Sequence, residues 1–119
     1  MSCTIGLLIS DSPSEVLTSS LTGLTKSLAM ELGKYKIRVN AICPGSVKGN
    51  RMKRVISSKA KLLKTTPNKI QKEFESMTSI PAFVTKEDIA NMVVFLLSNQ
   101  SIYISGQSIS VDGNTERMI

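Results

Sequence analysis

Residues 36–47 have the sequence KIRVNAICPGSV, and this stretch decides the fold. Apolar residues alternate with polar ones over residues 36–43, which predicts a β-strand; the apolar positions are Ile37, Val39, Ala41 and Cys43. Pro44 and Gly45 then end the strand. In α/β folds, ligands bind beyond the carboxyl ends of the strands, so the loop at residues 44–49 is the expected place for a site.

Helical patterns lie on both sides of this strand. Leucines at helical spacing predict a helix over residues 13–32, with Leu17, Leu21, Leu24, Leu28 and Leu32 forming one apolar stripe. A capping box over residues 12–15 would begin this helix, and Gly33 is expected at its C′ position. Two shorter helices are predicted between residues 50 and 80, marked by Met52, Val55 and Ile56 and then by Ile70, Phe74 and Met77, with Pro67 between them.

The C-terminal part of the chain predicts one more helix and one more strand. A capping box from Thr85 to Asp88 begins the helix, whose expected apolar face consists of Ile89, Met92, Val93, Leu96 and Leu97. The final strand is predicted at residues 107–111 and ends at the Asp112-Gly113 turn. A helical crossover between the two strands indicates that they are parallel neighbours in one sheet.

This order of elements predicts an α/β fold with a single domain over residues 1–119. The pattern fits part of an open parallel sheet with two or three strands and flanking helices. Parallel sheets are covered on both faces, and the chain offers little with which to do so. We therefore expect either that another chain completes the sheet or that the isolated chain is marginally stable.

Composition narrows the function classes. The chain has 119 residues, 41% of them hydrophobic, and a mean hydropathy of +0.06, as expected of one soluble globular domain. The absence of histidine excludes Ser-His-Asp hydrolysis and histidine-based zinc sites. Cys3 and Cys43 lack metal-ligand spacing, so we expect no metal site and two reduced thiols in a cytoplasmic protein. We expect no membrane partner, because no stretch approaches the roughly 18 apolar residues of a membrane span.

The net charge of +6 is unevenly distributed. No acidic residue lies between Leu32 and Glu73, whereas twelve basic residues do: Lys34, Lys36, Arg38, Lys48, Arg51, Lys53, Arg54, Lys59, Lys61, Lys64, Lys69 and Lys72. Such a cluster can bind nucleic acid, or it can be a solvated face or a face for an acidic substrate or another subunit. Tyr35 is the one aromatic residue within this cluster, which is too few for bases to stack along it, so we do not expect a nucleic-acid partner.

Three segments resemble the C-terminal half of short-chain dehydrogenase/reductases: GLTKSLAMELGKYKIRVNAICPGSV at residues 23–47, KEDIANMVVFLLS at residues 86–98 and ISGQSISVDGNTE at residues 104–116. The resemblance implies a partial Rossmann-like fold, the C-terminal portion of a doubly wound parallel sheet, and NAD(P)-dependent oxidoreduction of a carbonyl or hydroxyl group. It implies that Pro44, Gly45 and Val47 contact the nicotinamide end of NAD or NADP, and that residues 49–80 form a substrate lid. The family's subunit contacts imply a homo-oligomer or a complementing chain.

The chain departs from the family pattern where the chemistry would be performed. By resemblance, Ser14 and Thr18 occupy the positions of the catalytic Tyr and Lys, Cys3 that of the catalytic Ser, and Gly49 that of a cofactor-contacting Thr. Serine and threonine cannot replace a phenol with a depressed pKa and its ammonium neighbour. The sequence also contains no GxGxxG turn for the coenzyme phosphates. We therefore assign no catalytic residue and expect a truncated member that does not catalyse the family reaction alone.

Two alternatives remain open from the residues themselves. One is a non-catalytic interaction module that forms homo- or hetero-oligomers, and the other is a basic protein that binds anions or nucleic acid. Two polar or reactive residues are expected to be structural rather than functional. Asn40 should satisfy backbone groups, and Cys43 should be a small core residue.

Overall fold

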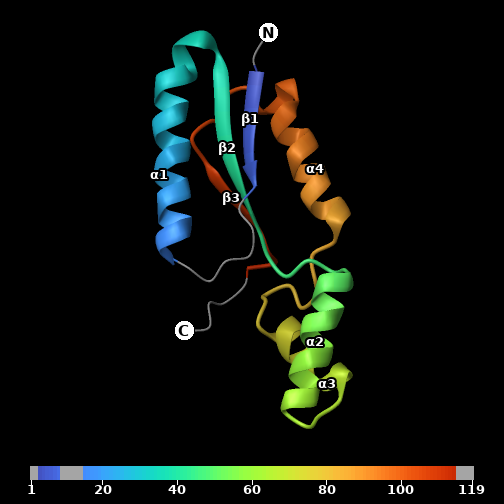
Figure 1. Cartoon of the computed structure of the whole chain (residues 1–119). Helices are drawn as coiled ribbons and strands as arrows, with labels where there is room; N and C mark the ends of the chain where they lie inside the picture. The colour runs from blue at the N-terminus through green and yellow to red at the C-terminus, as the bar shows by residue number, and fades with distance from the viewer. Residues whose placement is uncertain (1–2, 9–14, 115–119) are drawn as a thin grey trace.

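The computed structural model describes residues 3–8 and 15–114, and its strands and helices alternate along the chain (Figure 1). The elements in order are β1 (Cys3–Leu8), α1 (Glu15–Leu32), the 3₁₀ turn η1 (Gly33–Tyr35), β2 (Ile37–Pro44), α2 (Asn50–Leu62), α3 (Pro67–Ser76), α4 (Lys86–Leu97), the 3₁₀ turn η2 (Asn99–Ser101) and β3 (Ser108–Val111).

The three strands form one parallel sheet in the order β1-β2-β3. β1 pairs with residues 37–42 of β2, and β3 pairs with residues 41–44. The α/β prediction and the parallel pairing of the two predicted strands are thereby confirmed. β1 was not predicted as a strand: its alternation is interrupted by Gly6 and Leu7-Leu8, and only its pairing with β2 makes it one.

Helices α1 and α4 cover opposite faces of the sheet (Figure 1). On one face, the Thr22 hydroxyl of α1 lies 3.2 Å from the Ser108 hydroxyl of β3. On the other, Arg38 of β2 contacts the end of α4 through Ser98. The expectation that the chain lacks helices to cover both faces is therefore wrong for the central strand, and Val39 and Ala41 are fully buried.

The two crossovers have opposite hands. Both connections advance across parallel strands in the same direction, from β1 to β2 and from β2 to β3. Their helices nevertheless lie on opposite faces of the sheet, so one crossover is right-handed and the other left-handed. Most crossovers are right-handed, because a helix joined to a twisted strand by a short connection can pack against the sheet only with that hand. The second connection is long enough, with α2 and α3 inserted before α4, to relax that constraint.

The helix ends agree with the sequence in two cases and differ in one. The Thr85–Asp88 capping box is present, with the Thr85 hydroxyl accepting from the Asp88 amide and the Asp88 carboxylate accepting from the Thr85 amide. Helix α1 ends at Leu32 as predicted. Gly33 is not its left-handed C′ residue, because the chain continues into η1 and Lys36 adopts φ 59° instead. The capping box predicted at residues 12–15 extends outside the described residues.

The predicted apolar faces are partly wrong. Leu96 is buried as expected, but Leu97, the last residue of α4, is 59% exposed. Leu24 of the α1 stripe and Val55 of α2 are likewise exposed. Helical spacing identifies a stripe, but contacts with the sheet or with α3 decide how much of it is covered.

Two polar side chains of β2 hold the connection between α4 and β3. Arg38 is buried and its guanidinium donates to the Ser101 carbonyl at 2.8 Å, the Ser101 hydroxyl at 3.0 Å and the Ser98 carbonyl at 3.3 Å. Asn40 donates to the Ile104 carbonyl at 2.9 Å and accepts from the Gln107 amide at 3.2 Å. The prediction that Asn40 satisfies backbone groups is confirmed. A positive charge at the end of α4 also suits the helix dipole.

Helices α2 and α3 form a hairpin beyond the carboxyl ends of the strands (Figure 1). Ile56, Ala60 and Ile70 make its core, and the partly buried Met52, Phe74 and Phe83 pack against them. Pro67 begins α3 at a position where a missing N–H has no cost. The hairpin therefore has its own small apolar core.

We predict that Arg38→Met lowers the free energy of unfolding by about 2–4 kcal/mol, because it leaves buried carbonyls without donors while keeping an apolar stem. Urea denaturation followed by circular dichroism measures the loss. Lys34→Met, at an exposed position in η1, is the matched control and should stay within about 0.5 kcal/mol of the parent. Equal stability of the two variants would contradict this role for Arg38.

Candidate functional site

The candidate site is the turn that leaves the carboxyl end of β2. The Gly45 amide donates to the Val111 carbonyl at 3.0 Å, which ties the turn to the end of β3. On its other side, Val47 forms an isolated parallel bridge with Val84. The Val84 amide donates to the Ser46 carbonyl at 3.0 Å, and the Lys48 amide donates to the Val84 carbonyl at 2.8 Å. Pro44, Gly45 and Val47 are thus brought together in one rigid turn at the sheet edge where sites of α/β proteins form.

Gly45 is required by close packing. A Cβ at this position would lie 2.6 Å from the Cβ of Asp112 and 2.7 Å from its Cα. Such contacts cannot form without moving the backbone, so only glycine allows the ends of β2 and β3 to approach this closely. The glycine therefore has a structural role here, whatever contacts its exposed side makes.

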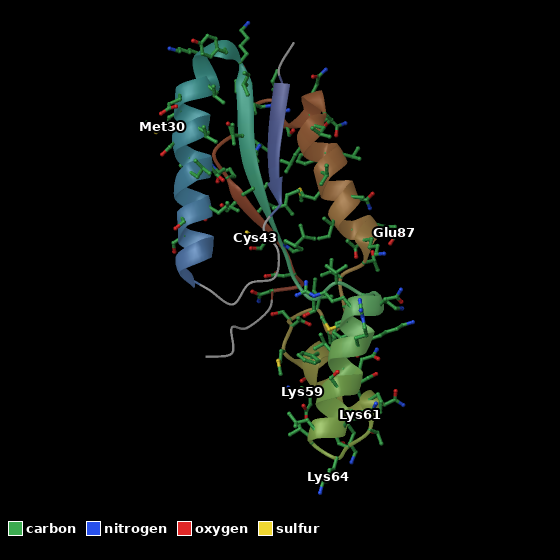
Figure 2. All side chains as sticks on the ribbon, viewed as in Figure 1. Met30, Cys43, Lys59, Lys61, Lys64 and Glu87 are labelled. Atoms are coloured by element: carbon green, nitrogen blue, oxygen red, sulfur yellow. The ribbon has the colours of Figure 1, made fainter. Side chains whose placement is uncertain are left out.

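Cys43 lies in β2 just before this turn (Figure 2), and it pairs with Ser110 of β3. Burial raises the pKa of the Cys43 thiol, and the carboxylate of Asp112 raises that pKa further. A thiol with a raised pKa stays protonated at neutral pH and is a poor nucleophile. Cys43 was expected to be a small core residue, and it is only partly buried.

The register separates Cys3 from the candidate site. Cys3 pairs with Ile37, at the amino end of β2, whereas the candidate turn follows Pro44 at the other end. At about 3.3 Å per residue these ends are roughly 23 Å apart. The resemblance that gave Cys3 the place of the catalytic Ser is therefore wrong, because a site residue would have to lie at the carboxyl edge.

The other positions singled out by the sequence contribute no acid or base. Ser14 lies outside the described residues, and only the backbone of Thr18, in α1, is described. Gly49 is the N-cap of α2 and provides no capping side chain. A Cβ there would be 3.9 Å from Lys86, so a larger residue could be accommodated.

Asp112 belongs to the candidate site and the sequence analysis missed it. Its carboxylate accepts from the Asn114 amide at 2.8 Å, which shapes the turn after β3. The Asp112-Gly113 pair was recognised only as a turn signal. Parallel pairing of the two predicted strands could have placed it beside Gly45, because the carboxyl ends of neighbouring parallel strands meet at one edge.

The α2–α3 hairpin is tied to this edge at its returning end. The Ile80 amide donates to the Gly113 carbonyl at 3.0 Å, and the Ser79 amide donates to the Asn114 carbonyl at 3.1 Å. Gly113 has φ 65°, a conformation that favours glycine. Together with the Val47–Val84 bridge, these bonds hold both ends of the hairpin at the carboxyl edge.

The chemistry available at this edge is limited. Over residues 3–8 and 15–114, no three histidine, cysteine or acidic side chains are grouped so as to hold a metal ion. The helices in those same ranges all fall short of the length and apolar character needed to cross a bilayer. What remains is a shaped backbone turn flanked by Cys43 and Asp112. It can contact one end of a ligand, and the one thiol that residues 3–8 and 15–114 place beside it has a raised pKa.

Comparison with known proteins identifies relatives along most of the chain. A family model described as enoyl-(acyl carrier protein) reductase matches residues 14–114. Carbonyl reductase [NADPH] 2 of Sus scrofa is 42% identical over 93 residues, which cover 78% of this chain and 34% of the relative. The chain thus spans about a third of the length of the curated relatives that it matches.

Solved structures agree with the sequence relatives. A short chain dehydrogenase family protein from Francisella tularensis superposes with a TM-score of 0.77 at 34% identity, over 82% of this chain and 40% of that one. L-sorbose reductase from Gluconobacter frateurii, solved with NADPH and L-sorbose, gives a TM-score of 0.82 at 25% identity, over 98% of this chain and 48% of that one. Both matches support the Rossmann-like assignment.

We predict that Gly45→Ala lowers the free energy of unfolding by about 1–3 kcal/mol, since the new methyl group overlaps the Asp112 backbone. Gly49→Ser is the control, because that position has room and serine is a good N-cap residue; it should be neutral or slightly stabilising. Thermal denaturation of both variants checks this. If Gly45→Ala melted with the parent, the close approach of the two strand ends would be refuted.

A second prediction concerns pH. The raised pKa of Cys43 means that above about pH 8.5 the unfolded chain loses the thiol proton before the folded chain does. The protonated thiol therefore makes its full contribution to the free energy of unfolding below that pH, and this contribution declines as the pH rises. In a Cys3→Ser background, urea midpoints at pH 7.5 and 9.5 should differ more for the parent than for Cys43→Ala. Identical pH shifts in the two proteins would exclude a perturbed thiol.

Proposed function

Because this chain belongs to the short-chain dehydrogenase/reductase family, we propose that it serves as the C-terminal part of an NAD(P)-dependent oxidoreductase acting on a carbonyl or hydroxyl group. The observation that carries this proposal is the rigid turn of Pro44, Gly45 and Val47 at the carboxyl edge of a parallel sheet. Two of the relatives named above support it: one is called carbonyl reductase [NADPH] 2, and the other is L-sorbose reductase, solved with NADPH and L-sorbose.

The residues of this chain fit only one end of the coenzyme. Pro44, Gly45 and Val47 would flank the nicotinamide of NAD or NADP. The sequence has no GxGxxG turn for the phosphates, and Gly49 supplies no hydroxyl. At the described carboxyl edge the ionisable side chains include Cys43 and Asp112 but no tyrosine, the residue type that the family uses to transfer the proton that accompanies hydride transfer. The chain therefore does not fit the whole coenzyme, and we assign it no catalytic step.

The phosphate turn and the catalytic residues, which these residues lack, would belong to a part of the enzyme that packs beside β1. In the described sheet β1 is the terminal strand, so its outer edge is available for another strand. Edges of this kind bind further strands readily, since their N–H and C=O groups have no ladder partners. Residues 49–80 would act as the substrate lid over the joined site. The enzyme would act in the cytoplasm, where the two cysteines of this chain, Cys3 and Cys43, would stay reduced.

The proposal is tested with a chimera in which the matched segment of porcine carbonyl reductase is replaced by the corresponding residues of this chain. We expect the chimera to fold and to bind NADPH, with Gly49→Thr, which restores a hydroxyl, binding more tightly. NADPH fluorescence titration and NADPH-dependent carbonyl reduction measure this. A chimera that melts cooperatively yet neither binds NADPH nor reduces a carbonyl would refute the proposal.

The isolated chain should give no NAD(P)H turnover. Its melting temperature should move by less than about 1 °C with millimolar NADH or NADPH, because without a phosphate site the dissociation constant lies above the ligand concentration. Differential scanning fluorimetry with both coenzymes checks this. A rise of several degrees would show that the chain holds a coenzyme site without a complement.

A further inference from the structure

The far end of the α2–α3 hairpin exposes two leucines among lysines. Leu62 is 81% exposed and Leu63 is 56% exposed. Lys59, Lys61 and Lys64 are their neighbours in sequence, and all three lie on the part of the hairpin that points away from the sheet (Figure 2). We call these five residues the hairpin tip. Exposed leucines surrounded by charges of one sign make an amphipathic surface in which apolar and basic groups are close together.

The backbone holds the hairpin tip in a defined shape. The Thr65 amide donates to the Ala60 carbonyl at 2.9 Å, and the Lys64 amide donates to the Lys61 carbonyl at 3.3 Å. This is the bond pattern of a Schellman motif, in which Lys64 with φ 53° occupies the left-handed position. The two leucines therefore project from a closed turn and not from a frayed helix end.

Positive charge extends from the hairpin tip along the exposed side of the hairpin. No acidic residue occurs between residues 48 and 72. The basic side chains that α2 exposes are Arg51, Lys53, Arg54 and Lys61, and those of α3 are Lys69 and Lys72. Lys59 is instead held over the ring of Phe74, with its ammonium 4.9 Å from the ring centroid. An anionic surface that meets the hairpin end-on would encounter lysines first.

We propose that the hairpin tip docks this protein on an anionic lipid bilayer. Lipid phosphates would bind the lysines while Leu62 and Leu63 enter the acyl boundary, so one partner satisfies both kinds of side chain. Nucleic acid offers phosphates but no apolar layer, and the hairpin tip has no aromatic residue on which bases could stack. This is surface attachment, and it differs from the expectation of no membrane partner, which rested on the lack of a spanning segment.

Sedimentation with sucrose-loaded vesicles tests the proposal with the full chain. Vesicles of phosphatidylcholine with 30% phosphatidylglycerol should bind the protein in 0.1 M salt, and pure phosphatidylcholine vesicles should not. Leu62→Ser/Leu63→Ser and Lys61→Gln/Lys64→Gln should each weaken binding about tenfold, as expected for lost apolar insertion and lost charge. Leu97→Ser, at an exposed leucine of α4, is the matched control and should bind like the parent.

A fluorescence measurement tests the orientation independently. The chain has no tryptophan, so Leu62→Trp and Leu97→Trp each provide a single reporter. Only Leu62→Trp should shift to shorter emission wavelengths with the anionic vesicles. The proposal is overturned if the parent does not sediment, if the leucine variant sediments like the parent, or if both reporters shift equally. The proposal is likewise overturned, in favour of a nucleic-acid surface, if the protein binds a 30-base-pair DNA duplex with the same affinity as the vesicles and the leucine substitutions leave the affinity for DNA unchanged.

Discussion

The hydrogen bonds from Arg38 and Asn40 to residues 98–107 are the constraint on which the rest of the structure depends. Both side chains project from the central strand into space closed by α4 and the segment that follows it. Arg38 Nε has no partner among the described residues, but both Nη atoms and the Asn40 side chain are hydrogen-bonded. Losing these buried bonds would be costly, so the segment can adopt few other positions. β3 starts directly after this segment, and its register against β2 follows from where the segment is held.

The carboxyl edge inherits its geometry from that register. Once β3 is aligned with β2, Val111 pairs with Pro44. Asp112 then lies so close to residue 45 that only a glycine fits there. The segment after β3 then binds the returning end of the α2–α3 hairpin through Gly113. The hydrogen bonds of Arg38 and Asn40 at the amino end of the sheet therefore position both the candidate coenzyme turn and the proposed lid at the carboxyl end.

The sequence predicted those parts of the fold that depend on local pattern. The alternation from Ile37 to Cys43 predicted β2, and the capping box at Thr85 predicted the start of α4. β1 was missed because its six residues carry little alternation and become a strand only by pairing. Gly33 was misjudged because local preference favours glycine as a helix stop, whereas the following 3₁₀ turn gave the left-handed position to Lys36. In the candidate site, Pro44, Gly45 and Val47 were identified by resemblance, while Asp112 required knowledge of how two distant segments meet.

Native-state amide hydrogen exchange on the isolated chain tests the central claim most directly, because it reports the stability of each strand separately. If Arg38 and Asn40 organise the fold, the amides of Val39 and Ala41 should be the slowest to exchange. Arg38→Met should then accelerate exchange in β2 and β3 together while the hairpin core around Ile56 and Ile70 keeps its protection. Uniformly fast exchange in the parent, or loss of protection in the hairpin along with the strands, would contradict a fold that is built outward from β2.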